Sequence, residues 1–139
     1  MDKKKILVVE DETQIRLMLA QDIREAGYEV FEAGDGAEAL EVFLKNAPDL
    51  VLADVLMPKM SGSDLMKHIH AIEEFKDIPF VILTARGLMR DYFETLRVAA
   101  FFDKPFVTAD ILAKISEILA RLSASKPAAA VAPQQAGPR

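Results

Sequence analysis

The sequence of 139 residues contains no cysteine, so it can form neither a disulfide nor a thiolate metal site. It also lacks any apolar run that approaches the roughly 20 residues needed to cross a bilayer. Its amino terminus leads into a short apolar run, without the longer apolar stretch and small-residue cleavage site of a signal peptide. We therefore expect a cytoplasmic protein with no membrane segment.

Basic charge is scarce relative to acidic charge. The chain carries 17 Lys and Arg residues against 22 Asp and Glu residues, which gives a net charge of −5 and a pI of about 5.1. Nucleic-acid binders usually have the opposite sign, so we expect no direct binding to nucleic acid. The content of 51% hydrophobic and 28% charged residues is typical of a globular protein, and the length suits one domain.

Short apolar runs alternate with segments of helical periodicity along the chain. Five runs are expected to form strands: Ile6–Val9, Tyr28–Ala33, Leu50–Ala53, Phe80–Leu83 and Ala99–Phe102. The spacing of apolar residues predicts five helices, the third from about Ser61 to Glu73, the fourth from about Leu88 to Val98 and the last from Thr108 to Leu122. Strands that are apolar throughout are typical of a parallel sheet covered on both faces. The sequence therefore predicts an α/β fold, a doubly wound five-stranded parallel sheet with helices on both faces.

The composition changes from about Ser123 onward. Residues 123–139 are rich in Ala and Pro and carry no periodic apolar residues. Such a segment buries too little apolar surface to offset the entropy of ordering it. We predict one folded domain over residues 1–122 and a disordered tail over residues 123–139, which is either a passive extension or a linker or docking segment.

Polar residues stand at the carboxyl ends of the expected strands. Glu10 and Asp11 follow the first strand, Asp54 the third, Thr84 the fourth and Lys104 the fifth. In open parallel sheets, ligands bind beyond the carboxyl ends of the strands, near the point where the strand order reverses. With the strand order 2-1-3-4-5, strands one and three flank that point, so we expect the three acidic residues to converge.

Three carboxylates that lie so close together cannot all stay ionised unaided. Either their pKa values rise, or a cation lies among them. Oxygen ligands without His or Cys favour a hard cation, Mg²⁺ or its substitute Mn²⁺, when phosphate is also present. The Lys104 ammonium can pair with a phosphoryl oxygen, and the Thr84 hydroxyl can donate a hydrogen bond. Together these groups suit phosphoryl transfer to a carboxylate.

Taken singly, each of these residues has an ordinary structural explanation. An acidic residue after a strand commonly caps a helix, and a lone lysine such as Lys104 is commonly a solvated surface residue. Their joint position at one edge of the sheet is what indicates a functional site.

Four segments of the sequence resemble the response-regulator receiver family, also called CheY-like. They are, in order, Ile6–Glu12, Asp49–Pro58 with Gly62, Ile82–Ala85 and Lys104–Phe106. Each match alone is modest, but all four in this order and spacing are highly specific. The resemblance extends from about Lys4 to Leu122.

The resemblance implies that Asp54 is the phosphoacceptor. Glu10, Asp11, Asp54 and the backbone carbonyl of Leu56 would hold Mg²⁺. The phosphoryl donor would be a phosphohistidine of a histidine kinase or phosphotransfer protein, or a small acyl phosphate. The chain would then be no enzyme beyond its own phosphorylation and dephosphorylation.

The resemblance also implies how the phosphorylated chain would signal. Thr84 would move to hydrogen-bond the phosphoryl group, and Phe101 would act with it as a switch by turning inward. Lys104 would contact the phosphoryl group, with a cis bond to Pro105. The changed surface would then control a downstream partner protein.

The chain departs from the family pattern just before Phe101. Val98-Ala99-Ala100 stands where the family has a Gly-Ala turn and a pair of acidic residues that support dimer contacts in its DNA-binding branch. The segment from Thr84 to Lys104 is also about two residues shorter than usual, which is within normal loop variation. We expect a monomer in the absence of phosphorylation.

Three alternatives remain. An aspartyl-phosphate phosphatase on a similar sheet would need a second acid two residues after Asp54, where Leu56 stands. A pseudo-receiver that binds partners without phosphorylation would have lost an acidic residue or the lysine, and none is lost. A receiver module cut from a larger regulator is compatible with the Ala- and Pro-rich segment.

Overall fold

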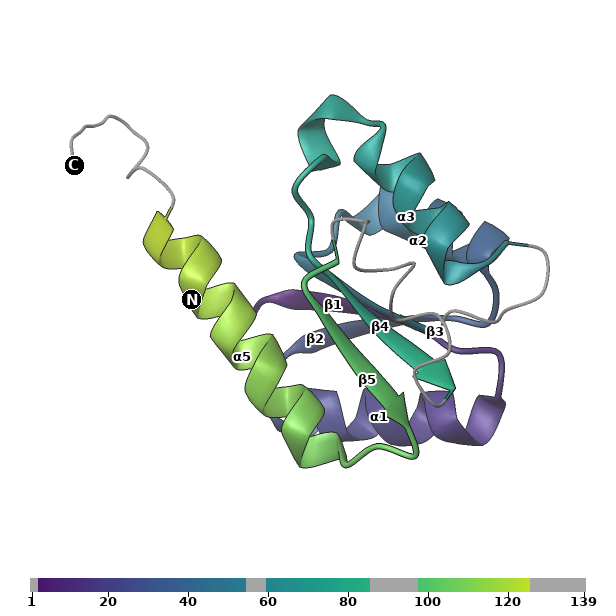
Figure 1. Ribbon diagram of the computed structural model, residues 1–139, viewed down its shortest axis with the longest axis vertical. Coiled ribbons are helices and arrows are strands. Elements are labelled where there is room, and N and C mark those ends of the chain that lie inside the picture. Colours follow the sequence, from purple (N-terminus) through teal and green to yellow (C-terminus); the bar gives the residue numbers. More distant parts are fainter. Residues whose placement is uncertain (1–2, 55–59, 86–97, 126–139) are drawn as a thin grey trace.

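The computed structural model describes residues 3–54, 60–85 and 98–125. Over these residues the chain forms five strands, four α-helices and one short 3-10 helix (Figure 1). The strands are β1 (Lys5–Val9), β2 (Glu29–Ala33), β3 (Leu50–Asp54), β4 (Phe80–Ala85) and β5 (Ala100–Lys104). The helices are α1 (Thr13–Glu25), α2 (Gly36–Asn46), α3 (Gly62–His70), α5 (Thr108–Ser125) and the 3-10 helix η1 (Glu73–Phe75).

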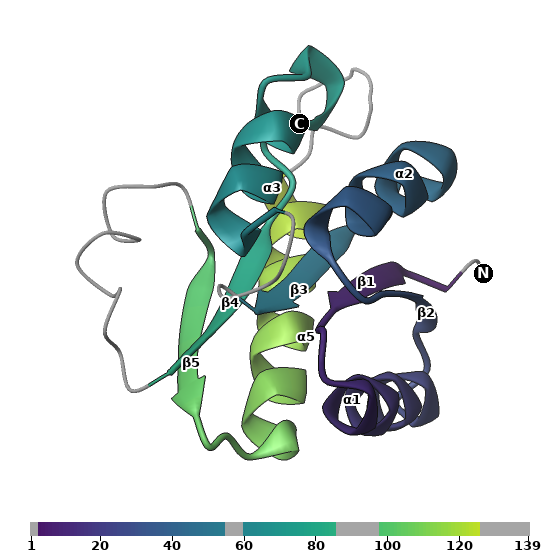
Figure 2. The ribbon, with the colours of Figure 1, turned by 90° about the vertical axis from the view of Figure 1, so that its right-hand side faces the viewer.

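The five strands form one parallel sheet in the order β2-β1-β3-β4-β5, as predicted. Helices α1 and α5 cover one face of this sheet, and α2 and α3 cover the other (Figures 1 and 2). The predicted doubly wound α/β fold is therefore confirmed.

The described helices differ from the predicted ones in two places, and one further predicted helix is not described. The structure describes four α-helices rather than five, because the helix predicted from Leu88 to Val98 lies almost wholly outside the described residues. The third predicted helix is divided, since α3 ends at His70 and η1 follows it. Helix α5 continues to Ser125, past the predicted domain end at Leu122, since Ala and Ser can extend a helix without adding apolar residues to its stripe. Residues 126–139 of the predicted tail lie outside the described residues.

The two faces of the sheet each bury an apolar cluster. On the α1–α5 face the cluster includes Leu19, Ile23 and Ile115, and on the α2–α3 face it includes Phe43 and Leu65. All residues of β3 are buried, because this central strand has a neighbour on each side and helices on both faces. This burial on both faces explains why the central strands are apolar throughout.

Local signals in the sequence set the helix boundaries. Gly27, with φ of +105°, follows the end of α1 in a conformation that favours glycine. The Asp35 side chain accepts a 2.8 Å hydrogen bond from the backbone N–H of Glu38 and caps α2. Ser61 caps α3 in the same way, with a 3.1 Å bond from the N–H of Asp64.

The start of α2 packs directly on the chain that leads into α3. A Cβ atom at Gly36 would lie only 2.3 Å from the carbonyl oxygen of Met60. Only glycine leaves room for this approach, so the first turn of α2 and the amino-terminal end of α3 are held in contact.

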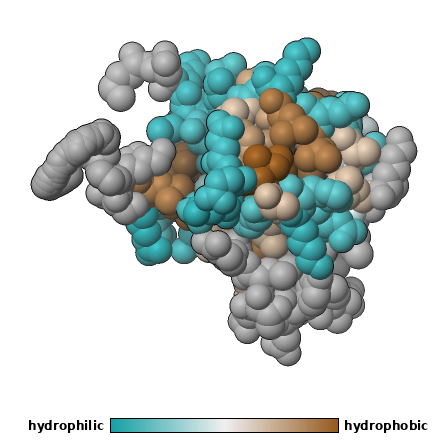
Figure 3. Space-filling view, turned by 90° about the horizontal axis from the view of Figure 1, so that it is seen from above, coloured by the Kyte–Doolittle hydropathy of each residue, from teal (hydrophilic) through white to brown (hydrophobic). Residues whose placement is uncertain are grey.

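The face that α2 and α3 form carries both hydrophilic and hydrophobic residues. Figure 3 looks onto the α2–α3 side, where hydrophilic residues surround a smaller hydrophobic patch. Among the described residues, the large apolar side chains that are most exposed are Leu17, Met18, Leu44 and Val107. No helix in the described part of the chain has both the length and the apolar character that a membrane span requires.

Candidate functional site

The register of the sheet brings two acidic strand ends together. Val9 of β1 lies opposite Ala53 of β3, so the residues that follow them, Glu10 and Asp54, are neighbours at the carboxyl end of the sheet. Asp11 comes directly after Glu10 in the loop that leads into α1. The predicted convergence of these three residues is confirmed.

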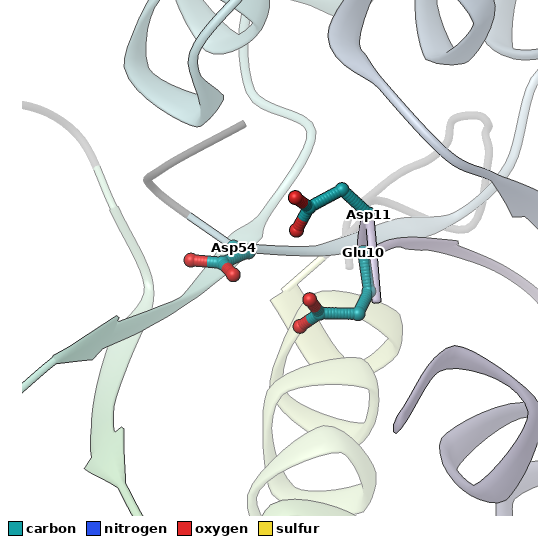
Figure 4. Close-up of side chains that lie close together, drawn as sticks. All are labelled: Glu10, Asp11 and Asp54. Carbon is teal, nitrogen blue, oxygen red and sulfur yellow. The ribbon is translucent and has the colours of Figure 1, made fainter. Parts of the chain in front are cut away.

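The three carboxylates gather around one space beyond the ends of β1 and β3 (Figure 4). One oxygen from each of Glu10, Asp11 and Asp54 lies within 4.8 Å of the other two. Glu10 is 1% exposed and Asp54 is 5% exposed, whereas Asp11 is open to solvent. Two of the three carboxylates of this acidic pocket are thus buried, and the third is exposed.

Lys104 adds a positive charge to this pocket from β5. Its Nζ atom donates hydrogen bonds to Oδ2 of Asp54 at 2.7 Å and to Oε1 of Glu10 at 3.4 Å. The following bond, Lys104–Pro105, is cis, as predicted. Lys104 therefore joins the acidic residues, which come from strands far from it in the sequence.

Burial decides the direction of the pKa shift of Glu10, whereas the acidic partners of Lys104 decide the direction of its shift. Burial raises the pKa of Glu10 to about 7, and the negative charge of Asp54 adds to the rise. The bond from the Glu12 backbone N–H and the charge of Lys104 oppose that rise but do not cancel it. For Lys104, burial acts to lower the pKa, but the hydrogen bond to Asp54 and the two acidic charges outweigh it and raise the pKa.

This set of donors fits a hard divalent cation. Carboxylate oxygens are the ligands that Mg²⁺ prefers, and Mg²⁺ needs only one or two carboxylates because it keeps several waters. When all three carboxylates are ionised, their three negative charges exceed the single positive charge of Lys104, which pairs with Glu10 and Asp54. A cation between the three carboxylates would relieve that excess.

Three further predicted site residues differ in how much of each the structure describes. Phe101 lies in β5 and packs, partly buried, against the apolar cluster on the α2–α3 face. The backbone of Thr84 lies in β4, opposite Asp103, but its hydroxyl is outside the described part of the structure. The carbonyl of Leu56 also lies outside the described residues.

Arg16 of α1 reaches the pocket without having been predicted from the sequence. Its Nη1 atom donates a 2.9 Å hydrogen bond to the backbone carbonyl of Glu10. The signal in the sequence is weak, because a basic residue in the second turn of an expected helix is ordinarily a solvated surface residue. Its contact depends on how α1 packs beside β1, which periodicity does not specify.

Comparison with known proteins gives one consistent result. The family model of the response regulator receiver domain matches residues 6–116. The probable transcriptional regulator ycf27 of Cyanophora paradoxa is 40% identical over 122 residues, which are 86% of this chain and 50% of that protein. The phosphate regulon transcriptional regulatory protein PhoB of Pseudomonas aeruginosa is 37% identical over 120 residues, which are 85% of this chain and 52% of that protein.

A solved structure shares the fold. The response regulator TrrA of Thermotoga maritima, crystallised in complex with Mg²⁺ and BeF, matches with a TM-score of 0.75 and 33% identity. The match covers 83% of this chain and 98% of TrrA. The chain therefore spans about half the length of the curated relatives that it matches, but nearly all of this response regulator.

Proposed function

The chain belongs to the response regulator receiver domain family of two-component signalling, and we propose that it accepts a phosphoryl group on Asp54. The observation that carries this proposal is the position of Asp54, which is buried beside two further carboxylates and bonded to Lys104 at 2.7 Å. Among the residues that the structure describes, the buried charged residues are Glu10 and Asp54.

The groups of the chain would share the chemistry in a simple way. An oxygen of the Asp54 carboxylate would attack the phosphorus atom of the donor, and the bond from phosphorus to the donor's nitrogen or acyl oxygen would break. Lys104, which now pairs with Asp54, would turn to an oxygen of the transferred group. The Thr84 hydroxyl would donate a further hydrogen bond, and Phe101 would follow its movement as part of the switch.

Glu10, Asp11 and Asp54, with the carbonyl of Leu56, would hold Mg²⁺ or Mn²⁺. When bound, such a cation neutralises charge on the phosphoryl oxygens during transfer. The complex of the related TrrA with Mg²⁺ and BeF supports a similar site in this chain.

The partners follow from this chemistry. The phosphoryl donor would be a histidine kinase or phosphotransfer protein, or a small acyl phosphate, and the output would be a downstream protein that recognises the changed surface. We propose that the unphosphorylated chain is a monomer in the cytoplasm, that it binds no nucleic acid by itself, and that it catalyses no reaction beyond its own phosphorylation and dephosphorylation. The relatives named as transcriptional regulators are about twice as long, so that activity describes longer proteins.

Intact-mass measurement tests the proposal. Incubation with acetyl phosphate and Mg²⁺ should add one phosphoryl group to the wild type, and EDTA should prevent the addition. Asp54→Asn should block it, whereas Asp110→Asn, which removes an exposed carboxylate in the first turn of α5, should not. Undiminished labelling of Asp54→Asn would refute the assignment.

A further inference from the structure

We propose that Arg16 is a positioning residue for the cation site, which it serves by holding the carbonyl of Glu10. The inference rests on the proposed function, because it concerns the cation that the three carboxylates would bind. The described side-chain contacts of Arg16 are to the backbone carbonyl of Glu10 and to Glu32, and not to the carboxylates of the site. Its effect would pass through the peptide unit that joins Glu10 to Asp11.

The guanidinium of Arg16 connects two parts of the fold. Its Nη1 atom donates to the Glu10 carbonyl oxygen at 2.9 Å, and its Nε atom lies 3.4 Å from Oε1 of Glu32 in β2. The side chain is only 19% exposed. A planar guanidinium that makes a hydrogen bond at Nη1 and an ion pair at Nε is restricted in orientation, so it can in turn restrict the carbonyl that it contacts.

The position of the Glu10 carbonyl affects the side chains of both Glu10 and Asp11. This carbonyl belongs to the peptide unit whose nitrogen is that of Asp11, and a peptide unit is planar. Fixing this oxygen therefore fixes the plane from which Glu10 and Asp11 both branch. The backbone N–H of Glu10 is held independently, by a 3.1 Å bond to the carbonyl of Ala33. The two backbone bonds together define the direction of the loop.

The hydrogen bonds of Glu12 at the start of α1 do not hold the Glu10 carbonyl, which is bonded to Arg16. Glu12 is the N-cap residue of α1, but its side chain makes no capping hydrogen bond. Its backbone N–H instead donates to Oε2 of Glu10 at 3.2 Å, which orients the side chain of Glu10 rather than its carbonyl. Groups that orient metal ligands typically change metal affinity by 10–100-fold when they are removed.

The sign of the effect separates positioning from simple electrostatics. A positive charge near a cation site repels the cation, so removal of Arg16 through charge alone should strengthen Mg²⁺ binding. Loss of positioning should weaken Mg²⁺ binding, because the backbone from which the Glu10 and Asp11 side chains extend is no longer held in one conformation. The two explanations thus predict opposite changes in the Mg²⁺ dissociation constant.

Arg24 provides a matched control within the same helix. It pairs with the same Glu32 carboxylate at 3.2 Å and donates to the carbonyl of Val30 in β2 at 3.1 Å. Arg24→Ala therefore removes the same charge and weakens the same contact between α1 and β2. It leaves the bond from Arg16 to the Glu10 carbonyl in place.

The experiment measures Mg²⁺ binding by calorimetry without any phosphoryl donor, and amide hydrogen exchange of Asp11 and Glu12 without metal. Arg16→Ala should raise the Mg²⁺ dissociation constant about tenfold and speed the exchange of both amides. Arg24→Ala should leave the dissociation constant within about twofold of wild type, since only a screened charge is lost. Arg16→Lys keeps the charge and one donor, and it should show a smaller rise of about threefold.

The Mg²⁺ dissociation constants of these variants either support or overturn the inference. Equal or tighter Mg²⁺ binding by Arg16→Ala would overturn the inference, even if the two amides exchange faster. An equal loss in Arg24→Ala would overturn it as well, because the carbonyl bond would then be irrelevant. If urea unfolding shows that Arg16→Ala does not fold, the Arg16→Lys comparison decides by the same criterion. A wild-type chain that binds no Mg²⁺ would instead refute the proposed function, and the inference with it.

Discussion

Strands β3 and β5 each carry a charged residue of the site, Asp54 and Lys104, but they differ in burial. Every residue of β3 is buried, whereas no residue of β5 is fully buried. β3 lies at the centre of the sheet, and β5 lies at its edge. The fold therefore places Asp54 by packing, whereas Lys104 is held largely by its two ion pairs. The acidic half of the site should persist without the basic half, but not the reverse.

The packing difference between the two strands can be measured directly. Leu52→Ala in β3 should lower the free energy of unfolding by about 3 kcal/mol, because it leaves a cavity in the buried centre. Phe102→Ala in β5 should cost about half as much, although it removes more atoms, because this ring is only partly buried. Urea unfolding of both variants tests the order, and an equal or larger loss in Phe102→Ala would contradict the comparison.

The buried charge of the acidic half should itself reduce stability. The pKa of Glu10 rises from 4.5 to about 7 on folding, so the folded chain keeps a proton there that the unfolded chain has released. The stability contributed by this proton is complete below about pH 4.5 and is lost as the pH rises through about 7. Without metal, Glu10→Gln should therefore be more stable than wild type at pH 8, by roughly 3 kcal/mol at most.

Urea unfolding at pH 5 and pH 8 checks this second prediction. The advantage of Glu10→Gln should be large at pH 8 and small at pH 5. Glu41→Gln, at an exposed position in α2, should show no such dependence. An advantage of Glu10→Gln that does not change with pH would show that burial of the charge is not its cause.

Packing is also tight at the start of α2, on one face of the sheet. Gly36→Ala should lower the free energy of unfolding by about 2 kcal/mol, because the new Cβ would overlap the backbone of Met60. Alanine has a higher helix propensity than glycine, so propensity alone would predict a gain in the free energy of unfolding. Gly34→Ala is the control, since its Cβ would meet no atom closer than 3.4 Å. Equal unfolding midpoints for Gly36→Ala and wild type would show that α2 is not held against Met60.

The smallest predicted effect concerns the basic half. Lys104→Ala should leave the carboxylates in place and strengthen Mg²⁺ binding about threefold, because an ammonium no longer occupies Asp54. Calorimetry at pH 9 is the appropriate measurement, because the pKa of Glu10 is about 7 in the wild type and the loss of Lys104 would raise it further. Weaker Mg²⁺ binding by Lys104→Ala would mean that Lys104 does help to place the acidic residues.

The central parts of the fold could be predicted from the sequence for a physical reason. Strands that are covered on both faces must be apolar throughout, so β1 and β3 are conspicuous, and the acidic residues that end them must meet at one edge. The pattern of edge strand β5 is a weaker indication of a strand, because β5 combines apolar residues with Asp103 and Lys104. The strand pattern places Lys104 at the same sheet edge as the acidic residues, but its ion pairs with Asp54 and Glu10 depend on side-chain positions that no local pattern specifies.

Other features depend on tertiary contacts that no local pattern encodes. The bond from Arg16 to the Glu10 carbonyl requires the packing of α1 beside β1, and the approach of Gly36 to Met60 requires two helices to meet. The predicted end of α5 at Leu122 is three residues too early, because Ser123–Ser125 extend the helix without extending its apolar stripe. The roles of Thr84 and Leu56 stay predictions, since their relevant atoms lie outside the described residues.

The central claim is that Asp54 alone receives the phosphoryl group. Borohydride reduces an aspartyl phosphate to homoserine, so peptide mass spectrometry after phosphorylation and reduction identifies the residue that was modified. The account predicts homoserine at position 54 and at no other position, and none when Mg²⁺ is withheld. Homoserine at position 11, or at any other aspartate in place of position 54, would contradict it.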